Sequence, residues 1–118
     1  MVCGYTTYMD LAREFLEGKE LVTTLMTREL ERCRIALERA EAGETTAMIC
    51  SGDAGVYGMA GPILQMAEEF PEVEIEVVPG PSAVIAALAV SGLPTSRFSF
   101  EGFLSTTRKN RLAHLEEI

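Results

Sequence analysis

Hydrophobic positions along this chain follow two alternating patterns. Short apolar runs predict strands, and stretches with an apolar residue every third or fourth position predict helices. The strands are expected at residues 1–4, 21–22, 45–50, 73–78 and 98–103. The helices are expected at 8–16, 30–40, 56–70 and 83–90, with a last one opening at Thr106 or Thr107. Strands and helices that alternate in this way indicate an α/β fold with an open parallel sheet.

Polar residues and glycines mark the expected ends of these helices. Thr6-Thr7, Thr27 and Ser82 are suitable N-caps, and Gly18 and Gly43 are suitable stops. The polar face of the helix at 30–40 is expected to be solvated. That face carries Glu31, Arg32, Glu38, Arg39 and Glu41.

A break at Gly92-Leu93-Pro94 separates the wholly apolar helix at 83–90 from a more polar end of the chain. Glycine and proline interrupt regular structure, so this is the best candidate for a domain boundary. We therefore expect an α/β domain over residues 1–92. Residues 93–118 are expected to be a linker and the beginning of a second α/β domain.

Composition narrows the possible functions. The chain has 118 residues and a formal net charge of −8, which opposes broad nucleic-acid binding. A basic cluster at Arg97, Arg108, Lys109 and Arg111 is an exception near the C-terminus. Three dispersed cysteines and one histidine form no metal-ligand pattern, and we interpret the thiols as core residues in a reducing cytoplasm. No apolar run is long enough to span a membrane.

The turn after the predicted strand at 45–50 is the strongest candidate for a binding site. Glycines recur at positions 52, 55, 58 and 61, and Asp53 stands where the strand should end. In open α/β sheets, ligands bind beyond the carboxyl ends of the strands, and glycines let the main chain approach them closely. The alternative is ordinary turn and cap chemistry. Neither a P-loop nor a standard dinucleotide fingerprint is indicated, because the P-loop lysine and a clean G-x-G-x-x-G are both absent.

Three strings of residues resemble the tetrapyrrole methylase family. They are Gly4-Tyr5-Thr6-Thr7-Tyr8, the run from Ser51 to Gly61, and Val78-Pro79-Gly80 followed by Ser82-Ala83. Members of this family are S-adenosylmethionine-dependent methyltransferases built from two α/β domains, with the cofactor in the cleft between them. Residues 2–80 are most similar to the corrin branch, the cobalt-precorrin-3B C17-methyltransferases. Residues 79–118 are more similar to the branch that methylates cytidine 2′-O in 16S rRNA.

The resemblance also implies what this stretch of sequence lacks. The family begins with a strand and a glycine-rich loop about thirty residues before the Gly-Tyr-Thr-Thr-Tyr string, and neither is present here. Most of the second domain is absent as well. We therefore expect a mosaic of two branches that contains the N-terminal domain without its first strand.

Site residues are likewise implied by the resemblance. The binding site for S-adenosylmethionine would be lined by Ser51, Gly52, Asp53, Val56, Ser82 and Ala83. In the corrin branch, Tyr5, Tyr8 and Tyr57 would face the flat macrocycle, since aromatic rings stack on extended π systems. Half-buried structural tyrosines are the alternative. No catalytic base is predicted, because methyl transfer from a sulfonium depends mainly on positioning.

Three functions follow from these expectations. The first is methylation of a precorrin-type tetrapyrrole in cobalamin biosynthesis, by a chain that is a fragment of the enzyme. The second is ribose methylation of 16S rRNA. The third is a non-catalytic domain that associates with itself. We also expect a homodimer that forms through exposed apolar surface near Leu88–Phe103.

Overall fold

The computed structural model describes all residues from 1 to 118 and divides them into two units, Met1–Ala83 and Val84–Ile118. Each unit is described by itself. The predicted domain boundary at residue 92 concerns the complete family fold and stays a prediction. None of the helices has both the length and the apolar character needed to cross a membrane.

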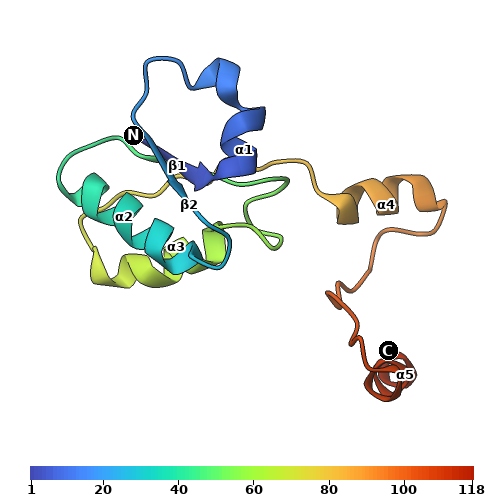
Figure 1. The fold of residues 1–118 in the computed structure, drawn as a ribbon. Helices are drawn as coiled ribbons and strands as arrows, with labels where there is room; N and C mark the ends of the chain where they lie inside the picture. Colours follow the sequence, from blue (N-terminus) through green and yellow to red (C-terminus); the bar gives the residue numbers. More distant parts are fainter. The chain divides into compact units, whose positions relative to one another are not determined.

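The first unit contains a parallel sheet of three strands (Figure 1). Its elements are β1 (Val2–Tyr5), α1 (Thr6–Leu11), the 3-10 turn Arg13–Phe15, β2 (Leu21–Thr24), α2 (Glu29–Glu41), β3 (Ala47–Ile49), α3 (Ala60–Met66) and the 3-10 turn Ala67–Glu69. The strand order is β2-β1-β3, and Val2 is paired with both Leu21 and Ala47. The predicted open parallel α/β sheet is confirmed.

The core lies on both faces of the central strand β1. On one face, Val2 packs with Met9 and Leu16. On the other face, Cys3 is fully buried, and its thiol lies near the carbonyl oxygen of Arg32 in α2. A side chain at Gly4 would meet Ile49 Cγ1 at 2.6 Å, so the glycine allows β1 and its neighbours to pack closely.

The second unit contains α4 (Ala83–Ser91), whose first residue closes the first unit, and α5 (Arg108–Glu117). Arg111 donates to the carbonyl oxygens of Ser105 and Thr106, and His114 Nε2 lies 3.3 Å from Glu101 Oε2. No residue of this unit is buried. Helix α4 therefore has the apolar composition of a core helix, but none of its residues is buried.

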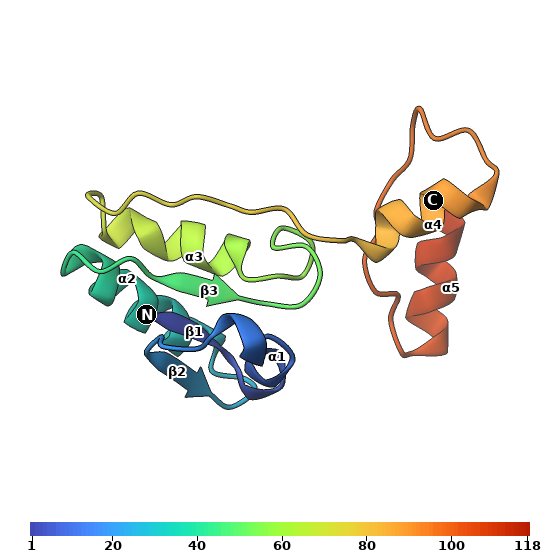
Figure 2. The ribbon, with the colours of Figure 1, turned by 90° about the horizontal axis from the view of Figure 1, so that it is seen from above.

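Two predicted strands are wrong. Residues 73–78 and 98–103 do not join a sheet, although Figure 2 shows residues 71–80 running in the same direction as β3. The reason is that a strand needs a hydrogen-bonded neighbour, and neither segment has one. The first of these segments is held only at its ends, where Val73 N donates to Phe70 O and Gly80 N donates to Asp53.

Several predicted helix boundaries also need correction. The helix expected from Val56 begins only at Ala60, because the glycine-rich stretch before it forms bends. The predicted threonine caps are not used: the N-caps of α1 and α2 are Tyr5 and Arg28, without side-chain hydrogen bonds. Gly43, with φ of 91°, follows α2 as predicted.

Candidate functional site

Two turns that are distant in sequence meet beyond the end of β3. Asp53 joins them: its Oδ1 accepts a hydrogen bond from Gly55 N at 2.8 Å, and its Oδ2 accepts one from Gly80 N at 3.0 Å. One side chain thus fastens the glycine-rich turn to the Pro79-Gly80 turn. The two segments implied by the family resemblance are therefore brought together.

The ionised form of Asp53 is favoured by these contacts. Hydrogen bonds from the main-chain amides of Gly80, Gly55 and Val56 hold the pKa of the Asp53 carboxyl below its ordinary value. The carboxylate thus remains negative over the neutral range. Three of its four acceptor sites are then occupied, which leaves one to accept a donor from a ligand.

The main chains of the two turns touch at a pair of glycines. A side chain at Gly80 would collide with the carbonyl oxygen of Gly52. Gly52 itself has φ of 70°, a left-handed conformation that favours glycine. Both positions therefore require glycine for the turns to approach this closely.

Ser82 presents an unexplained polar group next to this junction. Its Oγ is buried and has no hydrogen-bond partner, so it does not cap α4 as the sequence suggested. A buried hydroxyl without a partner costs free energy, which a ligand that hydrogen-bonds to it would recover. Ser51 and Ala83 are exposed, and Val56 is 37% exposed. These three residues are accessible to a ligand.

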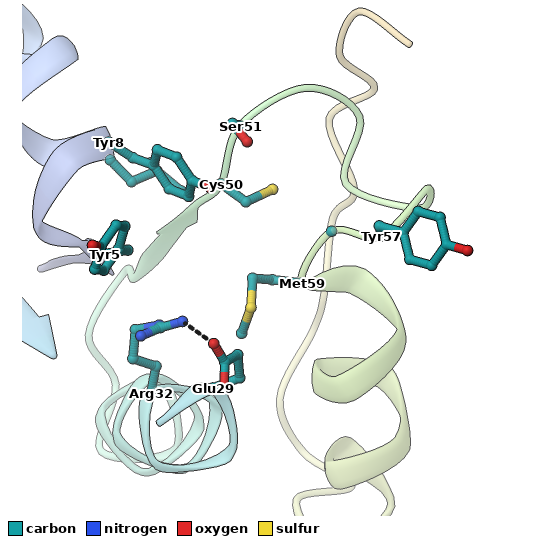
Figure 3. Close-up of a pocket in the computed structure, with 10 residues that line it drawn as sticks. Tyr5, Tyr8, Glu29, Arg32, Cys50, Ser51, Tyr57 and Met59 are labelled. Atoms are coloured by element: carbon teal, nitrogen blue, oxygen red, sulfur yellow. Dashed lines mark ion pairs between the residues drawn. The ribbon is translucent and has the colours of Figure 1, made fainter. Parts of the chain in front are cut away.

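A small pocket of about 120 Å³ lies beside the same turn (Figure 3). It is lined by Tyr5, Tyr8, Glu29, Arg32, Ile49, Cys50, Ser51, Tyr57, Gly58 and Met59. The rings of Tyr5 and Tyr8 pack edge to face, with centroids 5.5 Å apart. The structure thus brings Ser51 together with the three predicted substrate-facing tyrosines, but the Tyr57 ring points away from the other two.

Arg32 also lines the pocket, which differs from the position predicted for it. It was expected on the solvated face of its helix, but it is only 4% exposed. Its guanidinium donates to Thr24 Oγ1 at 2.6 Å and Leu25 O at 3.2 Å, and it pairs with Glu29 at 3.4 Å. The sequence pattern does indicate this burial. Arg32 lies four positions before the core residue Ala36 and therefore on the same face of the helix.

Glu29 provides the opposite charge in this pocket. Hydrogen bonds from its own main-chain amide and from Thr27, together with the charge of Arg32, hold the pKa of the Glu29 carboxyl below its ordinary value. The pocket lining therefore combines an ion pair with two aromatic rings and part of the glycine-rich turn. Such a lining can accept a ligand that has both a flat surface and polar groups.

Comparison with known proteins identifies the family of this chain. The sequence profile described as "Tetrapyrrole (Corrin/Porphyrin) Methylases" matches residues 2–118. The chain belongs to the tetrapyrrole methylases. It is 45% identical over 95 residues to the probable cobalt-factor III C(17)-methyltransferase of Salmonella typhimurium, covering 80% of this chain and 39% of that protein.

This tetrapyrrole methylase chain also matches the second branch. It is 43% identical over 82 residues to ribosomal RNA small subunit methyltransferase I of Xylella fastidiosa, covering 67% of this chain and 30% of that protein. Because this match is longer than residues 79–118, similarity to that branch extends into the earlier part of the chain. The predicted resemblance to both branches is confirmed.

A solved structure supports the fold. The crystal structure of the methyltransferase CobJ superposes with a TM-score of 0.69 at 32% identity, covering 98% of this chain and 49% of CobJ. The chain therefore spans half or less of the length of the relatives named here. What those longer proteins do can be transferred to this chain only as a proposal.

The residues at the joined turns suit S-adenosylmethionine chemically. A carboxylate accepts hydrogen bonds from ammonium and ribose hydroxyl groups, and the glycines allow the main chain to approach the ligand. The unpartnered Ser82 hydroxyl offers one further donor and acceptor. The cofactor supplies an activated methyl group when it is bound.

Proposed function

We propose that this chain forms the cofactor-binding part of an S-adenosylmethionine-dependent methyltransferase that acts on a tetrapyrrole in cobalamin biosynthesis. The observation that carries the proposal is the buried, unpartnered hydroxyl of Ser82 beside two turns that Asp53 fastens together. Membership of the tetrapyrrole methylases and the 45% identity to a cobalt-factor III methyltransferase support the choice of reaction.

The cofactor would be held by Ser51, Gly52, Asp53, Val56, Ser82 and Ala83. Asp53 and the main chain at Gly52 would bind its polar groups, and Val56 would cover an apolar part. The protein's contribution is to orient the methyl group and exclude water, since the leaving group needs no further activation. No residue of the chain is assigned as a catalytic base.

The tetrapyrrole would lie against the pocket formed by Tyr5 and Tyr8. Their edge-to-face pair offers an aromatic surface for a macrocycle, and the guanidinium of Arg32, which also lines the pocket, offers a positive charge for acidic groups. Tyr57, which points away from this pair, would contact the substrate at its rim.

Ribose methylation of ribosomal RNA is the second candidate. The 43% identity to ribosomal RNA small subunit methyltransferase I favours it. Against it stands the net charge of −8, because RNA binding relies on basic surface. The basic residues Arg97, Arg108, Lys109 and Arg111 would have to provide the contact. Transfer of a methyl group to rRNA, and not to a tetrapyrrole, would select this function.

A cytoplasmic homodimer completes the proposal. The apolar residues Val90, Leu93 and Phe98 in the expected contact region Leu88–Phe103 are all exposed. Association through this surface would remove them from water. Sedimentation that shows only monomer at high protein concentration would contradict the dimer. A dimer that binds no cofactor would instead support a non-catalytic, self-associating domain.

Calorimetric titration with S-adenosylhomocysteine, the product form of the cofactor, tests the site. We expect saturable binding that Asp53→Ala abolishes, because that substitution releases the two turns. Ser82→Ala should weaken binding about tenfold, the effect of one lost hydrogen bond. Asp10→Ala and Ser91→Ala are matched controls outside the site and should bind normally. A folded chain that does not bind the ligand would refute the cofactor site.

A further inference from the structure

The guanidinium of Arg32 is anchored firmly at one nitrogen and loosely at another. Nη1 donates hydrogen bonds to Thr24 Oγ1 at 2.6 Å and to the carbonyl oxygen of Leu25 at 3.2 Å. Nη2 lies 3.4 Å from Glu29 Oε1 (Figure 3). A hydrogen bond between a guanidinium and a carboxylate is usually shorter, about 2.7–2.9 Å. A buried cation therefore lines the pocket with a nitrogen for which the protein supplies only a distant partner.

Glu29 can leave this position more easily than Arg32 can. The Glu29 side chain is 43% exposed, whereas that of Arg32 is 5% exposed. One oxygen of Glu29, Oε1, faces Arg32 and also accepts a hydrogen bond from the Thr27 amide at 3.2 Å. An exposed carboxylate loses little free energy when it turns into water. Arg32 cannot follow it, because Nη1 stays bound to Thr24 and Leu25.

The main chain beside Glu29 has an unusual conformation. Thr27 has φ of 71°, and Tyr57, which lines the same pocket, has φ of 55°. They are the only two residues other than glycine with positive φ, a region that is least suitable for a β-branched residue such as threonine. Strained residues of this kind persist where contacts hold them, and they are common at ligand sites. The hydrogen bond from Thr27 to Glu29 is one such contact, so the turn and the carboxylate are coupled.

The pocket has room for a small group only. Its volume of about 120 Å³ is below the range of about 300–1,000 Å³ that is usual for sites enclosing a whole ligand of drug size. Tyr5, Tyr8, Ile49 and Met59 supply apolar surface, and Arg32 is the only cation in the lining. A short alkyl chain that ends in a carboxylate matches this combination.

We propose that the pocket binds one short alkyl carboxylate and that Glu29 takes the place of this carboxylate while the pocket is empty. The entering carboxylate accepts hydrogen bonds from Arg32 Nη2, Glu29 turns into solvent, and the Thr27 amide loses its acceptor. Arg32 is the receptor, and Glu29 is a specificity residue, because a neutral group of the same shape cannot replace its charge. Assigning the carboxylate to an acidic side chain of a tetrapyrrole rests on the proposed function.

An NMR titration of the full, ¹⁵N-labelled chain with sodium propionate tests this proposal. Propionamide is the neutral probe of the same shape, and sodium chloride keeps the ionic strength constant. We expect propionate to shift the amide signals of Thr27 and Tyr8 saturably, and propionamide to leave them unchanged. Equal shifts with both probes, or a Thr27 signal that does not move at saturation, would overturn the proposal.

This titration needs no cofactor, so its result is separate from the test with S-adenosylhomocysteine. A chain that binds S-adenosylhomocysteine but shows no shift with propionate would refute the carboxylate pocket and leave the methyltransferase proposal standing. A chain that binds propionate but not S-adenosylhomocysteine would support the pocket and refute the cofactor site.

The variant Glu29→Gln removes the competing charge but keeps an oxygen for the Thr27 amide. Propionate should bind to it roughly threefold to fivefold more tightly, the effect of one partly exposed ion pair. The matched control Glu31→Gln removes the same charge from an exposed partner of Arg28 that does not line the pocket, and it should bind like the parent chain. Weaker binding by Glu29→Gln, or an equal gain in both variants, would contradict the displacement of Glu29.

Discussion

The two units of this chain use apolar residues in different ways. In Met1–Ala83, the apolar residues of β1, α1 and α2 are buried against one another, and Cys3 and Cys33 are fully enclosed. In Val84–Ile118, helix α4 is almost wholly apolar, yet Ile85 and Val90 are exposed. Apolar composition therefore predicts that a segment needs a covering surface, but it does not supply that surface.

The largest difference between the units should appear when a leucine is truncated. Leu37→Ala in α2 removes a side chain that is 3% exposed and should lower the free energy of unfolding by about 2–5 kcal/mol. Leu93→Ala, at a position 71% exposed, should change it by about 0.5 kcal/mol or less. Urea denaturation measures both. Equal losses would show that the second unit has a core of its own.

Buried and exposed positions can also be compared at the start of α2, where Arg32 is buried and Arg28 is exposed. Arg32→Met removes the hydrogen bonds to Thr24 and Leu25 and the ion pair with Glu29, and we expect a loss of about 1–3 kcal/mol because these contacts surround a buried charged group. Arg28→Met breaks only the exposed ion pair with Glu31 and should cost about 0.5 kcal/mol or less. Similar unfolding free energies for these two variants would contradict the buried role of Arg32.

The Asp53 link should respond to acid. Its pKa is lowered in the folded chain, so its contribution is complete above the ordinary value of about 3.9 and is lost as the pH falls through the lower folded value. The NMR shift of the Gly80 amide should titrate with a midpoint below about 3.9. Asp53→Asn should remove that step, whereas Asp10→Asn should leave it. A Gly80 amide that is insensitive to pH would disprove the link.

The smallest effect is expected in the second unit. His114 and Glu101 form a contact whose side chains are about one-third exposed. His114→Gln should therefore change the unfolding free energy by about 0.5 kcal/mol or less. Thermal denaturation of the variant beside Leu93→Ala checks this expectation. A loss as large as that of Leu37→Ala would place His114 in a folded core, contrary to the comparison.

Local patterns predicted much of the first unit. The apolar runs at 1–4 and 45–50 and the helical spacing at 30–40 correctly indicated β1, β3 and α2. The glycine-rich turn was also correctly placed after a strand. These features depend on nearby residues, which the sequence shows directly.

The errors concern features that depend on distant partners. Residues 73–78 have the alternation of a strand but no neighbouring strand to pair with. The spacing to Ala36 indicates that Arg32 is buried, but its partners Thr24 and Leu25 lie before α2 and are not indicated by any pattern within the helix. The link from Asp53 to Gly80 spans 27 residues, and no local pattern reports it. Long-range pairing therefore sets the limit of what the sequence predicted here.

The contact between Gly52 and Gly80 also restricts how this protein can change over evolutionary time. Any substitution of a glycine adds a side-chain carbon, and at position 80 that atom would strike the carbonyl oxygen of Gly52. No single replacement at this position is small enough to avoid the collision. The neighbouring Pro79 and Pro81 are exposed and can vary more freely. A substitution of Gly80 is therefore compatible with the fold only if the two turns also change their positions. Otherwise, position 80 remains glycine.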